Sequence, residues 1–213
     1  MLSAGESTVY RIDPELHAVV ETISVGHDPR GMAITGDDLW VTNSVDRTVT
    51  RINVKTNEPV ALIEVGTRPD AIAAGPAGLW VANSGDNTIQ QIDPETGEPG
   101  KPIYVDDGPD GLAVDESSVW VAHGRSGTVM QIDAKTGTQM SASVAVGSGP
   151  RGILRSGDDV WVTNELSASV TRIDVATRRP HPIDVGDGPT DLAVLGDDAV
   201  SYTHLTLPTN REV

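Results

Sequence analysis

The chain has 213 residues, no cysteine and a formal charge of −16 at pH 7. The lack of cysteine excludes disulfide bonds and thiolate chemistry, and the acidic balance argues against nucleic acid or an anionic membrane surface as a partner, because both need a basic face. The sequence has no apolar run of about eighteen residues, so no membrane insertion is expected, and no signal peptide is visible at its start.

Three markers recur along the chain with one period of about 40 residues. The first is a tryptophan in a phrase such as LWVTN, at Trp40, Trp80, Trp120 and Trp161. The second is a Gly-x-x-Pro phrase, with Asp106 in place of its glycine in the third copy. Its proline lies at Pro29, Pro69, Pro109, Pro150 and Pro189. The third is an Ile-Asp or Ile-Asn pair, at Ile12, Ile52, Ile92, Ile132 and Ile173. One shared period indicates a single repeated structural unit.

Each period predicts four short strands. In residues 67–106 these are 71–74, 79–83, 88–93 and 102–105, separated by clusters of Gly, Pro, Asn and Asp. Four strands in about 40 residues, repeated, are typical of a β-propeller, in which each blade buries its faces on its neighbours. We therefore predict an all-β fold, a β-propeller of four-stranded antiparallel blades with about five blades present.

In chain order, the propeller is expected to occupy residues 1–200. Residues 1–26 are expected to hold strands three and four of a partial blade, and residues 187–200 strand one of another. Four whole blades are expected at residues 27–66, 67–106, 107–147 and 148–186. If the two ends join, they form one composite blade and close the ring. The favoured alternative is a chain cut out of a larger propeller.

The repeat stops abruptly after residue 200. Residues 201–213 begin SYTHLTLPTN, which resembles the translated product of a sequencing adapter. We therefore expect residues 201–213 to be a non-native tail that packs poorly, and we read no function from it.

The phrases WVTN and WVAN, with Gly-x-x-Pro before them and T-V-x-R-I-D after, resemble YVTN-type β-propeller repeats. They are also similar to the repeats of the virginiamycin B lyase and NHL superfamilies. The resemblance implies a bacterial protein placed at the cell surface, outside the cell or in the periplasm. It also implies a lyase-like alternative that uses a histidine, a glutamate and a divalent metal such as Mg²⁺. Strand two of those lyases more often reads WFTE, so the WVTN and WVAN phrases favour a non-catalytic module.

The residue after each recurring proline is expected to circle one mouth of the propeller. These residues are Arg30, Asp70, Asp110, Arg151 and Thr190. An arginine fork suits a carboxylate or phosphate, while aspartates suit a cation or hydroxyl groups. Solvated loop charges are the alternative interpretation.

Two histidines are expected on the same face. His27 belongs to the Gly-x-x-Pro loops, and His123 replaces an asparagine that other blades keep at Asn43, Asn83 and Asn164. Those asparagines are expected to form Asx turns with nearby backbone, a role that histidine partly imitates. No shared ligand spacing links the two histidines, so no metal site is predicted.

The sequence thus favours a binding module, part of a larger bacterial protein, that recognises a protein or a small polar ligand at the Gly-x-x-Pro face. Its candidate residues are His27, Arg30, Asp70, Asp110, His123 and Arg151, and no catalytic residue or cofactor is assigned. The alternative, a metal-dependent carbon–oxygen lyase, requires His27 and His123 to lie near each other and near a pair of carboxylates.

Overall fold

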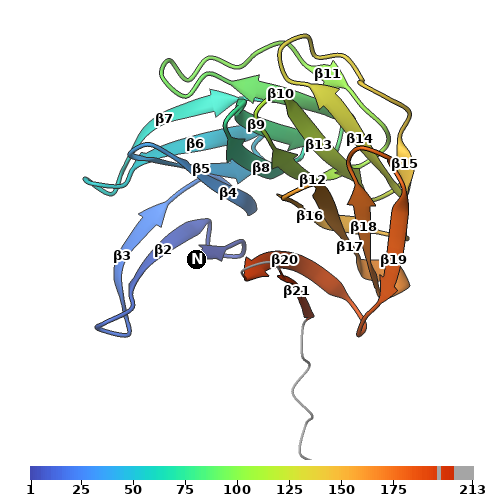
Figure 1. Cartoon of the computed structure of the whole chain (residues 1–213). Coiled ribbons are helices and arrows are strands. Elements are labelled where there is room, and N and C mark those ends of the chain that lie inside the picture. Colours follow the sequence, from blue (N-terminus) through green and yellow to red (C-terminus); the bar gives the residue numbers. More distant parts are fainter. Residues whose placement is uncertain (196–197, 204–213) are drawn as a thin grey trace, which may run out of the picture.

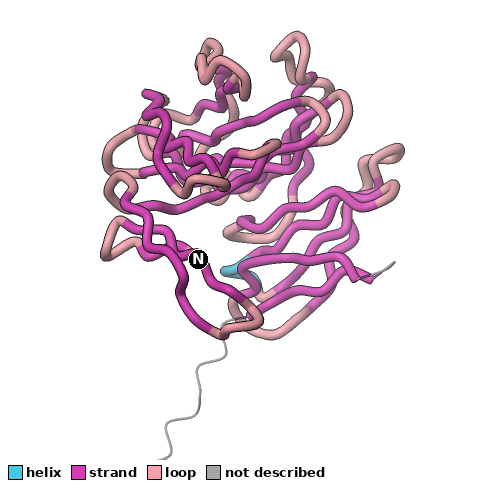
Figure 2. Tube along the Cα trace, turned by 90° about the vertical axis from the view of Figure 1, so that its left-hand side faces the viewer, coloured by secondary structure: helices cyan, strands magenta, loops and turns pink. Residues whose placement is uncertain are grey.

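Short strands rich in β-branched residues, separated by turn residues, form six antiparallel sheets in the part of the chain that the structure describes (Figure 1). The computed structural model describes residues 1–195 and 198–203. Four of the sheets have four strands each, the N-terminal sheet has three, and the C-terminal sheet has two. Figure 2 shows that strands make up most of the described chain. The single helical turn within it is η1 (Glu165–Ser167). The predicted fold class, an all-β propeller of four-stranded blades, is confirmed.

Each complete sheet runs from an inner strand near the centre of the molecule to an outer strand, in chain order. The second sheet comprises β4 (Pro29–Thr35), β5 (Asp38–Asn43), β6 (Thr48–Asn53) and β7 (Glu58–Glu64). The third comprises β8 (Pro69–Gly75), β9 (Gly78–Asn83), β10 (Thr88–Ile92) and β11 (Ile103–Tyr104). The fourth comprises β12 (Pro109–Val114), β13 (Ser118–His123), β14 (Thr128–Asp133) and β15 (Val144–Ala145). The fifth comprises β16 (Pro150–Ser156), β17 (Asp159–Asn164), β18 (Ser169–Asp174) and β19 (Pro180–Asp184).

The two ends of the described chain form incomplete sheets. The first sheet contains β1 (Leu2–Ser3), β2 (Thr8–Asp13) and β3 (Ala18–Ser24), so the expectation of only two strands in residues 1–26 is wrong. The last sheet contains β20 (Pro189–Leu195) and β21 (Asp198–Thr203). Strand β21 therefore continues past the predicted boundary at residue 200. The rest of the predicted tail, 204–213, lies outside the described residues.

The first and last sheets are separate sheets. No backbone pairing joins β20 or β21 to β1, β2 or β3 within the described residues. Consecutive sheets pack side by side, with the inner strands β4, β8, β12, β16 and β20 following one another around the centre.

The core lies between sheets rather than within one layer. Trp40, Trp80 and Trp120 are buried, and each packs against apolar residues of the following sheet. Trp80, for example, shares a cluster with Leu112 and Val119. One large ring per blade fills the same gap at each of these three contacts, which explains why the tryptophan keeps the repeat period.

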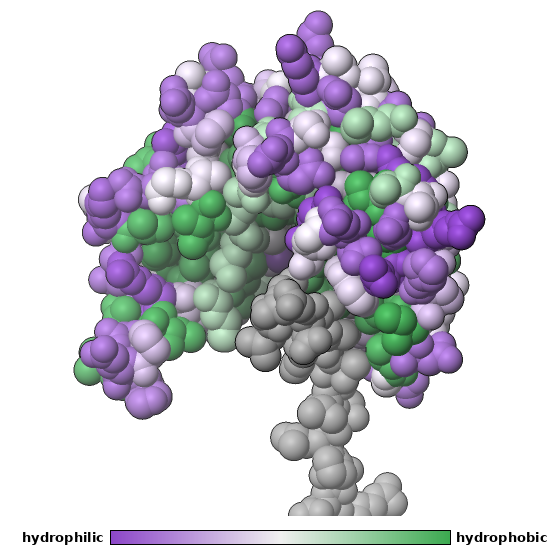
Figure 3. Space-filling view, viewed as in Figure 1, coloured by the Kyte–Doolittle hydropathy of each residue, from purple (hydrophilic) through white to green (hydrophobic). Residues whose placement is uncertain are grey.

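Repeat-equivalent residues become exposed where a neighbouring sheet lacks strands. Ile72 on β8 is 8% exposed because it packs on the second sheet, whereas its equivalent Met32 on β4 is 47% exposed. The sheet that Met32 faces has no inner strand. Hydrophobic surface is visible where the first two sheets meet (Figure 3). Trp161, which faces the two-stranded last sheet, is likewise only partly buried.

The recurring Ile-Asp and Ile-Asn pairs have a local structural role. The carboxylate of Asp93 accepts hydrogen bonds from the backbone N–H groups of Glu95 and Thr96, at 2.8 and 3.1 Å. Asn53 and Asp133 make the same contacts in their own sheets. These Asx turns begin the connection from the third to the fourth strand of a blade, so this marker encodes a turn.

Candidate functional site: a charged cavity at the centre of the propeller

The residue after each recurring proline sits at an irregularity of strand pairing. The register between the first and second strands shifts just after Pro29, Pro69, Pro109, Pro150 and Pro189. A bulge of this kind leaves a residue without a cross-strand partner and re-aims its side chain. The repeat thereby turns one side chain per blade toward the centre of the propeller.

The turn that precedes each inner strand requires a left-handed backbone. The residue before the proline has a positive φ in all five loops, between 53° at Arg68 and 72° at Gly108. Glycine occupies three of these positions because it adopts this conformation without a steric penalty. The Gly-Pro pairs of the repeat therefore hold the mouth residues in place.

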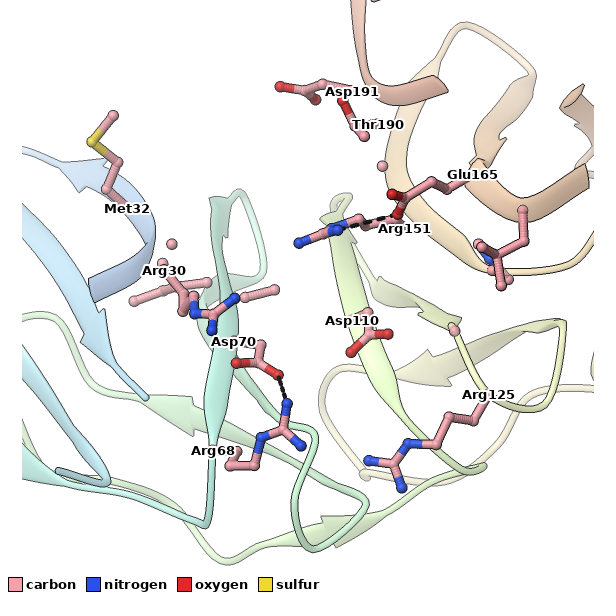
Figure 4. A pocket seen from close by; sticks show the side chains of 18 residues that line it. Arg30, Met32, Arg68, Asp70, Asp110, Arg125, Arg151, Glu165, Thr190 and Asp191 are labelled. Carbon is pink, nitrogen blue, oxygen red and sulfur yellow. Dashed lines mark hydrogen bonds and ion pairs between the residues drawn. The ribbon is translucent and has the colours of Figure 1, made fainter. Parts of the chain in front are cut away.

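These side chains line one cavity of about 600 Å³ (Figure 4). The structure brings together four of the predicted site residues here, namely Arg30, Asp70, Asp110 and Arg151. Thr190, the fifth residue of the predicted ring, also lines the cavity. The two predicted histidines do not.

The cavity has further charged groups that the sequence did not identify as site residues. Arg68, Arg125, Glu165 and Asp191 line it as well. Arg125 and Glu165 lie in connections between the second and third strands, which open on the same face as the Gly-x-x-Pro loops. These residues could have been found from the order of the strands. The loops between the second and third strands open at the same mouth as the Gly-x-x-Pro loops, so a charged residue in either set can line it.

Three of the four charged mouth residues are held by a partner. Arg30 donates to Asp28 at 2.9 Å, and Arg151 donates to Glu165 at 3.1 Å. Asp70 accepts hydrogen bonds from the hydroxyls of Ser44, at 3.0 Å, and Ser84. Fixed side chains of this kind form a preorganised polar surface.

Asp110 differs from the other three. Among the described residues, no group donates a hydrogen bond to its carboxylate and no cation lies within 4.0 Å of it. Burial raises the pKa of Asp110, and the negative charge of Asp70 raises it further, while Arg151, Arg125 and Arg68 act in the opposite direction. Asp110 is thus a half-buried carboxylate that faces the cavity with its acceptor sites unused.

The raised pKa of Asp110 predicts a stability effect with a definite sign. The folded state holds the Asp110 proton more tightly than the unfolded chain, so stability falls as pH rises from the unfolded pKa of about 3.9 through the higher folded value. Asp110→Asn removes this penalty. We expect the variant to be more stable than the parent protein at pH 7, with a gain that shrinks as the pH approaches about 4. Urea unfolding at both pH values measures the difference.

Asp93→Asn is a matched control with the opposite sign. Backbone hydrogen bonds from Thr96 and Glu95 lower the pKa of Asp93, so its charge stabilises the fold at neutral pH and this contribution is lost on acidification. The Asn variant is expected to be less stable than the parent protein at pH 7. Equal behaviour of the two variants would contradict the assignment of Asp110 as a destabilising carboxylate.

The two histidines do not line the cavity. His27 is exposed, and its Nδ1 lies 3.0 Å from the carboxylate of Asp46. His123 is buried, with no hydrogen-bond partner for either ring nitrogen among the described residues. Burial lowers the pKa of His123, against the opposing charge of Asp106. Neither imidazole therefore contributes to the cavity that the arginines and aspartates of the mouth line.

The expected Asx-turn role of the equivalent asparagines is wrong. Asn43 is buried and donates to the hydroxyls of Thr48 and Thr50, at 3.0 and 2.8 Å. Asn164 makes the same two contacts with Ser169 and Thr171. The asparagines thus tie the second strand to the third through side chains rather than through turn backbone.

His123 belongs to a set of changes confined to the fourth sheet. Met130 stands where the other complete sheets have Thr50, Gln90 and Thr171, so the second acceptor is absent there. Asp106 stands where the others have Gly26, Gly66 and Gly147, and it accepts from Thr128 at 3.0 Å. The substitution at His123 is therefore matched by changes in its surroundings.

Two further findings concern the part of the chain that the structure describes. No three His, Cys, Asp or Glu side chains converge there in a way that suits a metal ion. No helix in that part is long and apolar enough to cross a membrane.

The fold and the cavity together define a β-propeller with a charged, solvent-accessible centre. Solved structures share this fold. The chain has a TM-score of 0.80 and 16% identity to virginiamycin B lyase from Staphylococcus aureus, covering 94% of this chain and 71% of that one. A functionally unknown protein from Desulfotomaculum acetoxidans gives a TM-score of 0.83 at 15% identity, covering 95% and 71%. Hydrazine synthase from Kuenenia stuttgartiensis gives 0.79 at 21% identity, covering 87% of this chain.

These similarities establish the propeller fold. The chain spans 64% of the length of the hydrazine synthase chain. In sequence, it matches no family model and no curated protein. The virginiamycin B lyase-like fold supports the coarse part of the resemblance, and the YVTN-type repeat assignment stays a prediction.

Proposed function

We propose that this propeller is a binding module that recognises a small polar ligand in the central cavity. The observation that carries the proposal is the convergence of charged side chains from several sheets on one space of about 600 Å³. A few fixed polar groups around a concave site are typical of small-molecule recognition. The cavity offers guanidinium donors at Arg30 and Arg151 and a carboxylate acceptor at Asp110, so it suits a ligand that carries polar groups of both kinds.

The proposal is one of binding rather than catalysis. The lyase-like alternative assigns acid–base chemistry to His27 or His123, and neither residue lines the cavity. A protein partner is the second kind of partner that the sequence suggests. The recessed position of Asp110, which is half-buried, favours a small molecule over a protein surface.

Amide NMR spectra test the location of binding. Acetate, methylammonium, glucose and glycylglycine are added separately to the ¹⁵N-labelled chain. We expect at least one of them to shift the amide signals of the residues that flank the mouth prolines, and Arg151→Ala to reduce that shift. These residues are Arg68, Asp70, Gly108, Asp110, Gly149 and Arg151. Arg179→Ala is the matched control, since it removes an exposed arginine that does not line the cavity. Shifts confined to the outer strands, or none at all, would contradict the proposal.

A further inference from the structure

The fourth sheet lacks the serine hydroxyl that donates a hydrogen bond to the equivalent aspartate of the third sheet. Asp70 and Asp110 are repeat-equivalent, each following a proline at the start of an inner strand. Asp70 receives the hydroxyl of Ser84, which follows Asn83 on its own sheet. The position equivalent to Ser84 in the next sheet is Gly124, as their backbone hydrogen bonds show: Ser84 N–H donates to Arg68 and Gly124 N–H to Gly108. Asp110 thus has no equivalent donor among the residues that the structure describes.

Gly124 also leaves room for the Asp110 carboxylate. A Cβ atom at position 124 would lie 2.0 Å from Oδ2 of Asp110, a distance at which one of the two groups must move. A serine at position 124, as in the preceding sheets, would therefore require the Asp110 carboxylate to turn from its present position. Within residues 1–195 and 198–203, this carboxylate is thus both unpaired and unobstructed by a side chain at position 124.

The next residue in the same loop is held away from Asp110. Arg125 donates to Asp107 at 3.0 Å and to the backbone carbonyl of Ser84 at 2.7 Å. Its charge contributes to the potential at Asp110 without forming an ion pair. The Asp110 carboxylate is only half-buried, so water can reach it. A ligand that donates a hydrogen bond could take the place of that water.

Cationic groups face the same space. Figure 4 shows Arg30 near Asp70 and Arg151 near Asp110, and all four residues line the cavity. Arg151 uses one of its nitrogens on Glu165, and a guanidinium has five N–H donors. Its unused donors suit a carboxylate. A ligand with only a positive charge would be repelled by these arginines, and a ligand with only a negative charge would be repelled by the aspartates.

We propose that the cavity binds small zwitterions, with the ammonium group of the ligand on Asp110 and its carboxylate on Arg151. This inference rests on the proposed function and specifies the class of ligand. The volume of the cavity leaves room for a ligand of dipeptide size or larger.

Calorimetric titration with three dipeptide probes tests the inference. Glycylglycine carries both charges, N-acetylglycylglycine lacks the ammonium group, and glycylglycinamide lacks the carboxylate. We expect glycylglycine to bind the full chain at least about tenfold more tightly than either capped probe, because each capped probe loses one charge-assisted hydrogen bond. Equal affinity for all three probes, or no binding of glycylglycine, would overturn the zwitterion assignment.

Variants locate the two charges. Asp110→Asn is expected to lower the affinity for glycylglycine about tenfold or more and to leave the affinity for N-acetylglycylglycine unchanged. Arg151→Gln is expected to lower the affinity for both probes that carry a carboxylate and to leave the affinity for glycylglycinamide unchanged. Gly124→Ser should lower the affinity for glycylglycine as much as Asp110→Asn does, because the serine side chain crowds the Asp110 carboxylate. Thermal melting confirms that each variant is folded, and Arg179→Ala serves as the control that keeps full affinity.

The outcome also separates this inference from the proposed function. If a singly charged probe binds best and still shifts the amides of the mouth, the propeller binds small polar ligands but not zwitterions. If the variants weaken all three probes equally, Asp110 does not select the ammonium group, and the assignment of the two charges is wrong.

Discussion

Trp80→Ala is expected to lower the free energy of unfolding by about 3–5 kcal/mol. The indole is 1% exposed and packs between the third and fourth sheets, in a cluster with Ile89, Val119 and Val121. Its removal deletes a large apolar surface and opens a cavity that two separate sheets must collapse to fill. Guanidinium unfolding followed by far-UV circular dichroism measures the loss.

Two substitutions serve as controls for this result. Trp161→Ala removes the equivalent residue from a partly exposed position, so its cost is expected to be smaller, about 1–2 kcal/mol. Arg30→Ala changes an exposed mouth residue and is expected to alter stability by less than about 0.5 kcal/mol. A loss for Arg30→Ala that matches the loss for Trp80→Ala would reverse the assignment of core and mouth.

Gly111→Ala is expected to lower the free energy of unfolding by about 2–3 kcal/mol, because it overpacks a site between two blades. A Cβ atom at this position would lie 2.0 Å from the backbone carbonyl oxygen of Arg151 on the neighbouring inner strand. Backbone cannot rotate away as a flexible side chain does, so β12 and β16 must separate. Because Asp110 and Arg151 sit beside the clash, we expect ligand binding to weaken as well. Chemical unfolding and calorimetric titration measure the two effects.

Gly31→Ala is the matched control for Gly111→Ala. It occupies the equivalent position on β4, but there a Cβ atom would lie no closer than 3.1 Å to its neighbours. A small shift accommodates that contact, so the expected loss of stability is below about 1 kcal/mol. Equal costs at the two positions would show that the approach of β12 and β16 does not limit stability.

Several features of the fold were predictable from the sequence because they repeat. The tryptophan, Gly-x-x-Pro and Ile-Asp markers each report a local requirement: a ring that fills the space between blades, a left-handed turn, and an Asx turn. A requirement that recurs at about 40 residues is visible without coordinates. The same logic predicted that Arg30, Asp70, Asp110 and Arg151 share one mouth, since equivalent positions in radially arranged blades face one centre.

The differences between equivalent residues required the tertiary structure. Asp70 and Asp110 look alike in the repeat, yet Asp70 is held by Ser44 and Ser84 whereas Asp110 faces Gly124. The two serines come from different sheets, so no local pattern reveals the contact. His123 shows the reverse, because its position in the repeat predicts the mouth face, but its side chain is buried and does not line the cavity. The repeat specifies which direction each strand runs and where it turns. The exposure of a residue and its free hydrogen-bonding capacity depend on contacts between blades, which only the assembled sheets create.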